Sequence, residues 1–166
     1  MRLRQLLLHS FCIAIVFVTT IALVIPFPIN GYFNLSDLTI MLAIFILDKY
    51  RYAISLSLGA VIADLMIMPI YAPMTFVIKW FLAISVLFLI RKTDNKFFVS
   101  ILPYILGGLW VGISYAIVDS ILFGYNIFFV SLMNNLIQGL CSSILTILSV
   151  PFIGQLKLYF KKFISR

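Results

Sequence analysis

The chain has 166 residues, of which 64% are hydrophobic and only 10% are charged, with 12 lysines and arginines against 5 aspartates and glutamates. A soluble domain carries about a quarter charged residues, so this composition excludes a soluble enzyme and a disordered chain. Because a bilayer-spanning helix needs roughly 20 apolar residues, residues 1–166 predict a single all-α, polytopic membrane domain. The charges form short clusters between apolar runs rather than a basic patch, which argues against a nucleic-acid partner.

Six apolar segments follow one another along the chain, and most end at a proline, a glycine or a charged cluster. The predicted transmembrane helices cover residues 6–25, 37–47, 53–68, 74–90, 97–123 and 127–153. The first has a basic start, as a signal peptide does. Its apolar stretch is long, however, and no small-x-small cleavage site precedes Pro26, so we interpret it as a retained span.

The basic residues predict the orientation of these six helices. When the loops alternate between the two sides, eleven of the twelve basic residues fall on one side. They are Arg2, Arg4, Lys49, Arg51, Arg91, Lys92, Lys96, Lys157, Lys161, Lys162 and Arg166. Since short cytoplasmic loops are enriched in lysine and arginine, we expect both termini to be cytoplasmic. The two halves show no internal repeat, which disfavours a transporter built from inverted repeats.

The twelfth basic residue, Lys79, lies inside the fourth predicted helix, where a charge costs about 2.5–3.5 kcal/mol. It follows the outer turn at Pro73 by six residues, or about 9 Å along a helix. Asp64 and Asp119 each precede an outer turn by five residues, or about 7.5 Å. Amides of the sixth helix begin at a similar depth, at Asn134, Asn135 and Gln138. The inner half has almost no such groups, so the pattern predicts a pocket open to the outside.

Each of these groups also has a purely structural interpretation. Lys79 and Asp64 can neutralise each other between helices, and Asp119 can reach the outer interface. The amides of the sixth helix can form hydrogen bonds with neighbouring helices. Aromatic residues near the same level, such as Tyr71 and Trp80, can form an interfacial belt. Their common depth favours a joint pocket for a small, planar, polar ligand. The candidate ligand contacts are Asp64, Lys79, Asp119, Asn134, Asn135, Gln138, Tyr71, Trp80, Tyr115 and Asn34.

Several motifs of enzymes are missing from the sequence. It has no glycine-rich nucleotide-binding loop ending in Lys-Ser/Thr and no zinc-ligand spacing. Asp64 and Asp119 lack the glycine flanks of an intramembrane aspartyl protease. We therefore expect no catalytic residue, no bound metal and no ATP site in this chain.

Three stretches in the first half of the chain resemble one family. They are Gly-Tyr-Phe-Asn-Leu-Ser-Asp-Leu-Thr-Ile-Met-Leu-Ala at 31–43, Gly-Ala-Val-Ile-Ala-Asp-Leu at 59–65 and Ile-Tyr-Ala-Pro-Met-Thr-Phe-Val-Ile-Lys at 70–79. They are similar to substrate-binding (S) subunits of energy-coupling-factor (ECF) vitamin transporters. The likeness is greatest to the branch with riboflavin, hydroxymethylpyrimidine and pyridoxine-type members.

The resemblance implies a six-helix vitamin-capture subunit in a bacterial plasma membrane, with a hydroxymethylpyrimidine- or pyridoxine-like ligand. It further implies a transmembrane coupling (T) subunit and two cytoplasmic ATPases, which would use ATP and Mg²⁺, while this chain binds no cofactor. The first outer loop, residues 30–37, would cap the ligand. Small residues of the first helix would pack on the T subunit, matched here by Ser10, Ala14 and Ala22.

Two other functions remain compatible with the sequence. One is a membrane scaffold without transport activity, such as the small multi-span protein of the rod-shape machinery, which predicts protein partners and no ligand. The other is a stand-alone secondary transporter, which predicts proton-dependent uptake by the chain alone.

Overall fold

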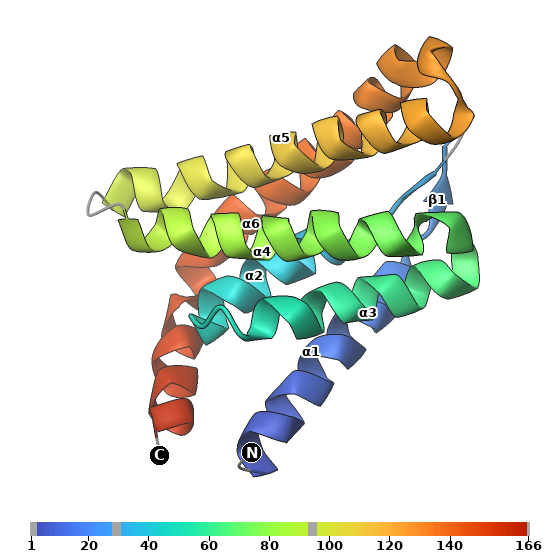
Figure 1. The fold of residues 1–166 in the computed structure, drawn as a ribbon. Helices are drawn as coiled ribbons and strands as arrows, with labels where there is room; N and C mark the ends of the chain where they lie inside the picture. The colour runs from blue at the N-terminus through green and yellow to red at the C-terminus, as the bar shows by residue number, and fades with distance from the viewer. Residues whose placement is uncertain (1–2, 28–30, 93–95, 166) are drawn as a thin grey trace.

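The computed structural model describes residues 3–27, 31–92 and 96–165, and helices make up most of it (Figure 1). The helices are α1 (Leu3–Ala22), α2 (Ser36–Leu47), α3 (Tyr52–Ile67), α4 (Ala72–Lys92), α5 (Lys96–Phe123) and α6 (Phe128–Ser165). Short 3₁₀ helices precede α4 and α6, namely η1 (Pro69–Tyr71) and η2 (Tyr125–Ile127). The strands β1 (Ile25–Pro26) and β2 (Tyr32–Phe33) pair antiparallel, with Ile25 opposite Phe33.

The all-α class is confirmed, but four of the described helical segments, rather than six, are long and apolar enough to cross a membrane. These segments are Leu3–Ala22, Pro69–Lys92, Ile101–Phe123 and Tyr125–Gly154. The other two, α2 and α3, have 12 and 16 residues, or about 18 and 24 Å, against a hydrocarbon core of about 30 Å. The six-span count and the cytoplasmic termini stay predictions. Arg2 and Arg166, used for the orientation, and Asn30, where the capping loop begins, lie outside the described residues.

The helices end where the sequence offers a local reason. α3 stops just before Pro69, since a residue preceding proline is disfavoured in the helical region. α5 ends at Phe123, and the next residue, Gly124, has a φ of 100°, a conformation that glycine adopts without strain. The last helix differs from the prediction, because α6 continues through the basic tail to Ser165.

The packing of the helices places several turns at one end of the bundle. α5 packs along α6, α3 lies between α1 and α4, and α2 packs against α4 and α6. Figure 1 shows the α3–α4 turn, the α5–α6 turn and the β1–β2 hairpin at the same end. Towards the other end, α2, α3, α4 and α5 share a core that includes Met41, Tyr52 and Tyr104. The end with the three turns carries the polar residues described below.

Glycines permit two close helix contacts. A Cβ atom on Gly139 of α6 would collide with the backbone of Gly108 of α5. A Cβ atom on Gly59 of α3 would lie 2.5 Å from the carbonyl oxygen of Ile13 of α1. Small residues allow helix backbones to approach in this way inside membranes, so both contacts require glycine.

The contact between α5 and α6 can be tested with Gly139→Ala. The added methyl group must push α5 away, and overpacking of this kind costs about 1–3 kcal/mol, which exceeds the gain of up to about 1 kcal/mol from replacing a helical glycine. We expect a lower Tm in detergent. The matched control is Gly154→Ala on the same helix, where a Cβ would meet nothing within 4 Å. Equal changes in Tm for the two variants would contradict the close contact.

Candidate functional site

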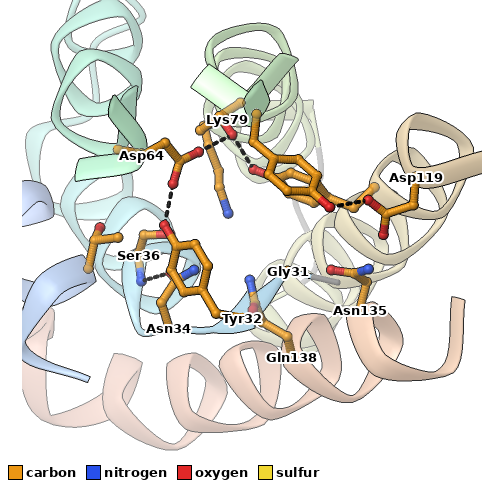
Figure 2. A pocket seen from close by; sticks show the side chains of 14 residues that line it. Gly31, Tyr32, Asn34, Ser36, Asp64, Lys79, Asp119, Asn135 and Gln138 are labelled. Atoms are coloured by element: carbon orange, nitrogen blue, oxygen red, sulfur yellow. Dashed lines mark hydrogen bonds between the residues drawn. The ribbon is translucent and has the colours of Figure 1, made fainter. Parts of the chain in front are cut away.

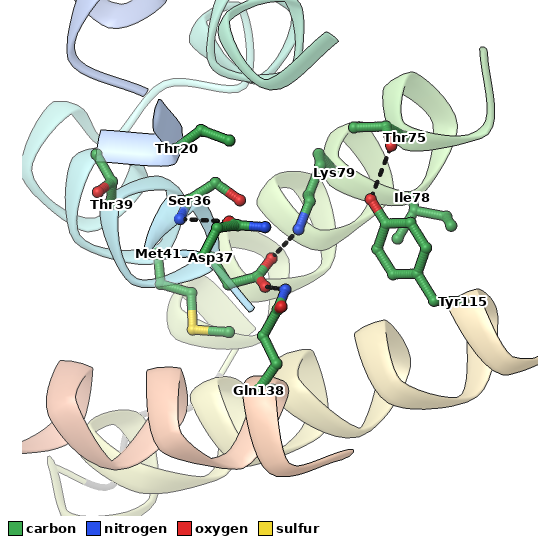
Figure 3. A network of polar contacts seen from close by, with 12 residues as sticks. Thr20, Ser36, Asp37, Thr39, Met41, Thr75, Ile78, Lys79, Tyr115 and Gln138 are labelled. Atoms are coloured by element: carbon green, nitrogen blue, oxygen red, sulfur yellow. Dashed lines mark hydrogen bonds and ion pairs between the residues drawn. The ribbon is translucent and has the colours of Figure 1, made fainter. Parts of the chain in front are cut away.

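A buried ion pair joins α2 to α4. The ammonium Nζ of Lys79 lies 2.5 Å from Asp37 Oδ1, and the two side chains are 2% and 0% exposed. Gln138 of α6 donates from Nε2 to the second carboxylate oxygen of Asp37 at 2.8 Å (Figure 3). One carboxylate therefore connects three helices, and the ion pair satisfies a lysine that would be costly inside a membrane.

A second carboxylate, Asp64 near the end of α3, accepts two hydroxyl hydrogen bonds (Figure 2). Tyr32 of the β hairpin donates to Oδ1 and Thr75 of α4 donates to Oδ2. Because Thr75 gives its single proton to the carboxylate, the Tyr115 hydroxyl, 2.9 Å away, donates to Thr75. Burial, followed by the charge of Asp64, raises the pKa of the Tyr32 phenol above its usual range. The Tyr32 hydroxyl therefore remains a donor at neutral pH.

The third carboxylate, Asp119 of α5, has the same kind of partners. Tyr71 of η1 donates its hydroxyl to Oδ1 at 2.6 Å, and Ser131 of α6 donates to Oδ2. Asn135, one turn further along α6, donates from Nδ2 to the Ser131 hydroxyl at 3.1 Å. The first turns of α6 are thus joined to the last turn of α5 and to the α3–α4 turn.

These groups surround one polar cavity of about 30 Å³. It is lined by Thr20, Gly31, Tyr32, Asn34, Ser36, Ala60, Asp64, Tyr71, Thr75, Lys79, Tyr115, Asp119, Asn135 and Gln138. This volume holds one or two water molecules, whereas small-molecule pockets measure about 300–1,000 Å³. The site is therefore contracted around its own hydrogen bonds, and a ligand of vitamin size requires some of these side chains to separate.

Eight of the ten predicted ligand contacts line this cavity: Asp64, Lys79, Asp119, Asn135, Gln138, Tyr71, Tyr115 and Asn34. Asn34 accepts from the backbone N–H of Ser36 at 2.8 Å, which shapes the loop before α2. Trp80 and Asn134 are not part of the lining, and Trp80 is 38% exposed. Contact of any of these residues with a ligand stays a prediction.

The predicted pairing of Lys79 with Asp64 is not what the structure contains, because the ion pair of Lys79 is made with Asp37. Asp37 was placed at the start of a predicted helix and in the capping loop, not among the pocket residues. Its signal in the sequence was the position of a carboxylate in the first turn of an apolar helix. Tyr32, Ser36 and Thr75 also line the cavity. Tyr32 and Ser36 were included only as part of the predicted capping loop, and Thr75 was missed, since hydroxyl residues occur throughout the chain.

A larger hollow of about 460 Å³ lies between α1, α2 and the last part of α6. Its lining is almost entirely apolar, with Phe11, Leu42 and Ile153 as examples. It lacks the converging polar groups that orient a small polar ligand. The smaller polar cavity is therefore the better candidate for ligand binding.

Residues 1–157 match the model of a family described as ECF-type riboflavin transporter, S component. The chain belongs to this family. No match to a curated protein was found. The match supports an ECF substrate-binding subunit, a membrane-embedded, vitamin-binding component of a transporter. S components of this kind generally work with a T subunit and ATPases. The family match does not show whether the chain belongs to the hydroxymethylpyrimidine and pyridoxine branch, which residues 31–79 resemble.

The ion pair of this S component can be tested with Asp37→Asn. The variant leaves the buried Lys79 ammonium without its counter-charge, and breaking a buried pair costs about 3–5 kcal/mol. We expect a large drop in Tm in detergent, and partial recovery in the double variant Asp37→Asn/Lys79→Met.

The matched control is Asp48→Asn, whose carboxylate pairs with Arg91 at 3.0 Å, with the two side chains 35% and 45% exposed. Exposed pairs contribute about 0–1 kcal/mol. Equal destabilisation by the two Asp→Asn changes would contradict the structural importance of the buried pair.

Proposed function

We propose that this S component captures a small vitamin or vitamin precursor from outside the cell and delivers it through an ATP-driven ECF complex. One observation carries the proposal: polar side chains from the β hairpin and from α2 to α6 converge on one cavity at one end of an otherwise apolar bundle. Buried ionisable groups inside a membrane protein mark ligand or ion pathways. The family match over residues 1–157 favours a ligand.

The cavity offers groups suited to a small polar ring. The Lys79 ammonium carries three N–H donors, one of which contacts Asp37. The rings of Tyr71 and Tyr115 meet edge to face with centroids 6.3 Å apart, and they provide flat surfaces for stacking. This combination supports a hydroxymethylpyrimidine- or pyridoxine-like ligand. Riboflavin, named in the description of the family, belongs in the same set of test compounds.

The hairpin loop is the part of the site that can open with the least disruption. Tyr32 is the loop residue that donates to Asp64, and its backbone belongs to a two-residue strand rather than to a helix. Breaking this one side-chain contact would separate the loop from α3 without unfolding a helix. Residues 31–35, which precede α2, would then close over the bound ligand.

A partner must supply the energy, because the sequence has no nucleotide-binding loop of its own. The proposed partners are a T subunit and two cytoplasmic ATPases. The T subunit would pack on α1, where Ser10, Ala14 and Ala22 are all exposed. Together with Val18, which is 56% exposed, these residues are spaced four apart and form a stripe along one face of α1. The stripe therefore lies on the surface of the isolated chain, where close helix packing with a partner is possible.

Ligand binding can be tested with Asn135→Ala. Asn135 lines the cavity and is 7% exposed, so its loss should weaken binding of the best ligand about tenfold, the equivalent of about 1.4 kcal/mol. The measurement is equilibrium binding of hydroxymethylpyrimidine, pyridoxine, thiamine and riboflavin to the full-length chain in detergent. Asn126→Ala, an exposed asparagine of η2 near the same end, is the matched control. Absence of submicromolar binding to every compound would count against vitamin capture.

The partner surface can be tested with Ala14→Trp. A bulky side chain on the exposed α1 stripe should abolish uptake by the reconstituted complex while ligand affinity of the isolated chain stays within twofold. Ile113→Trp places the same side chain on α5, at a position that is 47% exposed, and should preserve uptake. Proton-dependent uptake by the chain alone in vesicles would contradict the need for a T subunit and ATPases.

A further inference from the structure

The cavity contains more negative than positive charge. Its lining includes two carboxylates, Asp64 and Asp119, and one ammonium, Lys79. The Lys79 charge is balanced by Asp37, 2.5 Å away. Among the residues that the structure describes, neither Asp64 nor Asp119 forms an ion pair. Their described partners are hydroxyl groups, which orient the two carboxylates but do not balance their charge.

The charge is also buried. Asp64 and Asp119 are 5% and 2% exposed, so water screens them only weakly. Buried charges in proteins are normally paired or coordinated, because an isolated ionised carboxylate is costly away from water. Two carboxylates of the cavity lining are therefore buried without a cationic partner among the described residues.

A second, independent feature points to a hydrogen-bond donor in the same cavity. Gln138 is 2% exposed, and its Oε1 has no hydrogen-bond partner. Its amide orientation is determined by Asp37, because a carboxylate oxygen accepts only from Nε2. Oε1 is therefore an unused acceptor in the cavity lining. Ser36 also lines the cavity, is 1% exposed and has an unpartnered hydroxyl.

We propose that the ligand of this site is a small organic cation with N–H donors, such as a ring that carries a protonated aminomethyl or amidine-like group. The inference rests on the proposed function and narrows its substrate class. Asp64 and Asp119 balance the positive charge, and Gln138 Oε1 accepts a ligand N–H. The ring of Tyr71 stabilises the cation further, because aromatic faces attract positive charge. A neutral ring such as the flavin of riboflavin leaves both carboxylates without a counter-ion.

The experiment compares ligands that differ in one charge. The first pair is pyridoxamine and pyridoxine, and the second is the 5-aminomethyl and 5-hydroxymethyl forms of 4-amino-2-methylpyrimidine. Each pair exchanges a protonated amino group for a hydroxyl of similar size. Thiamine, a permanent cation, and riboflavin, which is neutral, complete the set. Affinities are measured by calorimetry with the full-length chain in lipid nanodiscs at neutral pH.

We expect the aminomethyl member of at least one pair to bind ten times more tightly than its hydroxymethyl counterpart. Asp64→Asn and Asp119→Asn keep the size of the side chain and remove its charge, so each should reduce this preference about tenfold. The affinity for the neutral member should remain within threefold, which a merely structural defect would not produce. Asp48→Asn, which removes a carboxylate outside the cavity, is the control and should leave the preference unchanged.

Equal or tighter binding of the neutral members, or a preference that survives both Asp→Asn changes, overturns the cationic ligand while vitamin capture stands. If no compound binds, native mass spectrometry of the purified chain decides. A retained cationic molecule supports the inference, and a retained neutral or anionic molecule overturns it. If no small molecule is retained and none binds, the proposed function fails and the inference fails with it.

Discussion

The arrangement of the site depends on the ion pair between Lys79 and Asp37. A lysine in the middle of an apolar helix must find a counter-charge, and the only carboxylate that contacts it among the described residues stands in the first turn of α2. The helix that carries this carboxylate has only 12 residues, and seven of them are buried. Gln138 then attaches the same carboxylate to α6, so three helices are held in one register by a single acidic side chain.

Two further carboxylates, Asp64 and Asp119, join the remaining elements of the bundle in the same way. Helices in a membrane gain little from the hydrophobic effect, and polar contacts and close packing decide how they associate. Asp64 connects α3 to the hairpin and α4, and Asp119 connects α5 to η1 and α6. The groups that shape the cavity are thus also the groups that hold the helices together. Because these internal contacts leave a cavity of only about 30 Å³, a ligand must exchange its own polar contacts for some of them.

The sequence predicted the helices and the level of the site, but not the pairing within it. Pro69, Gly124 and the charged clusters interrupt the apolar runs, so most predicted helix ends fall close to the observed ones. The rise per residue converts distance from a turn into depth, and this brought Asp64, Lys79 and Asp119 to one level. Depth carries no information about rotation between helices, so it could not choose Asp37 over Asp64 as the partner of Lys79. The helical tail of α6 and the hairpin were missed because polar residues and two-residue strands leave no periodic signal.

The contacts that stabilise the bundle lie deeper in it than the contacts that close the cavity. Thr75, which holds Asp64, lies four residues before Lys79 on α4, so the ion pair lies about one turn, or 6 Å, deeper. The bonds made by Tyr32 and Tyr71 belong to the hairpin and to η1, at the end of the bundle where the connections lie. A ligand can therefore displace hydroxyl donors near the connections while Lys79, Asp37 and Gln138 keep the helices in register. Because the carboxylates released by those hydroxyls remain buried, a ligand that brings positive charge is the one that restores their balance.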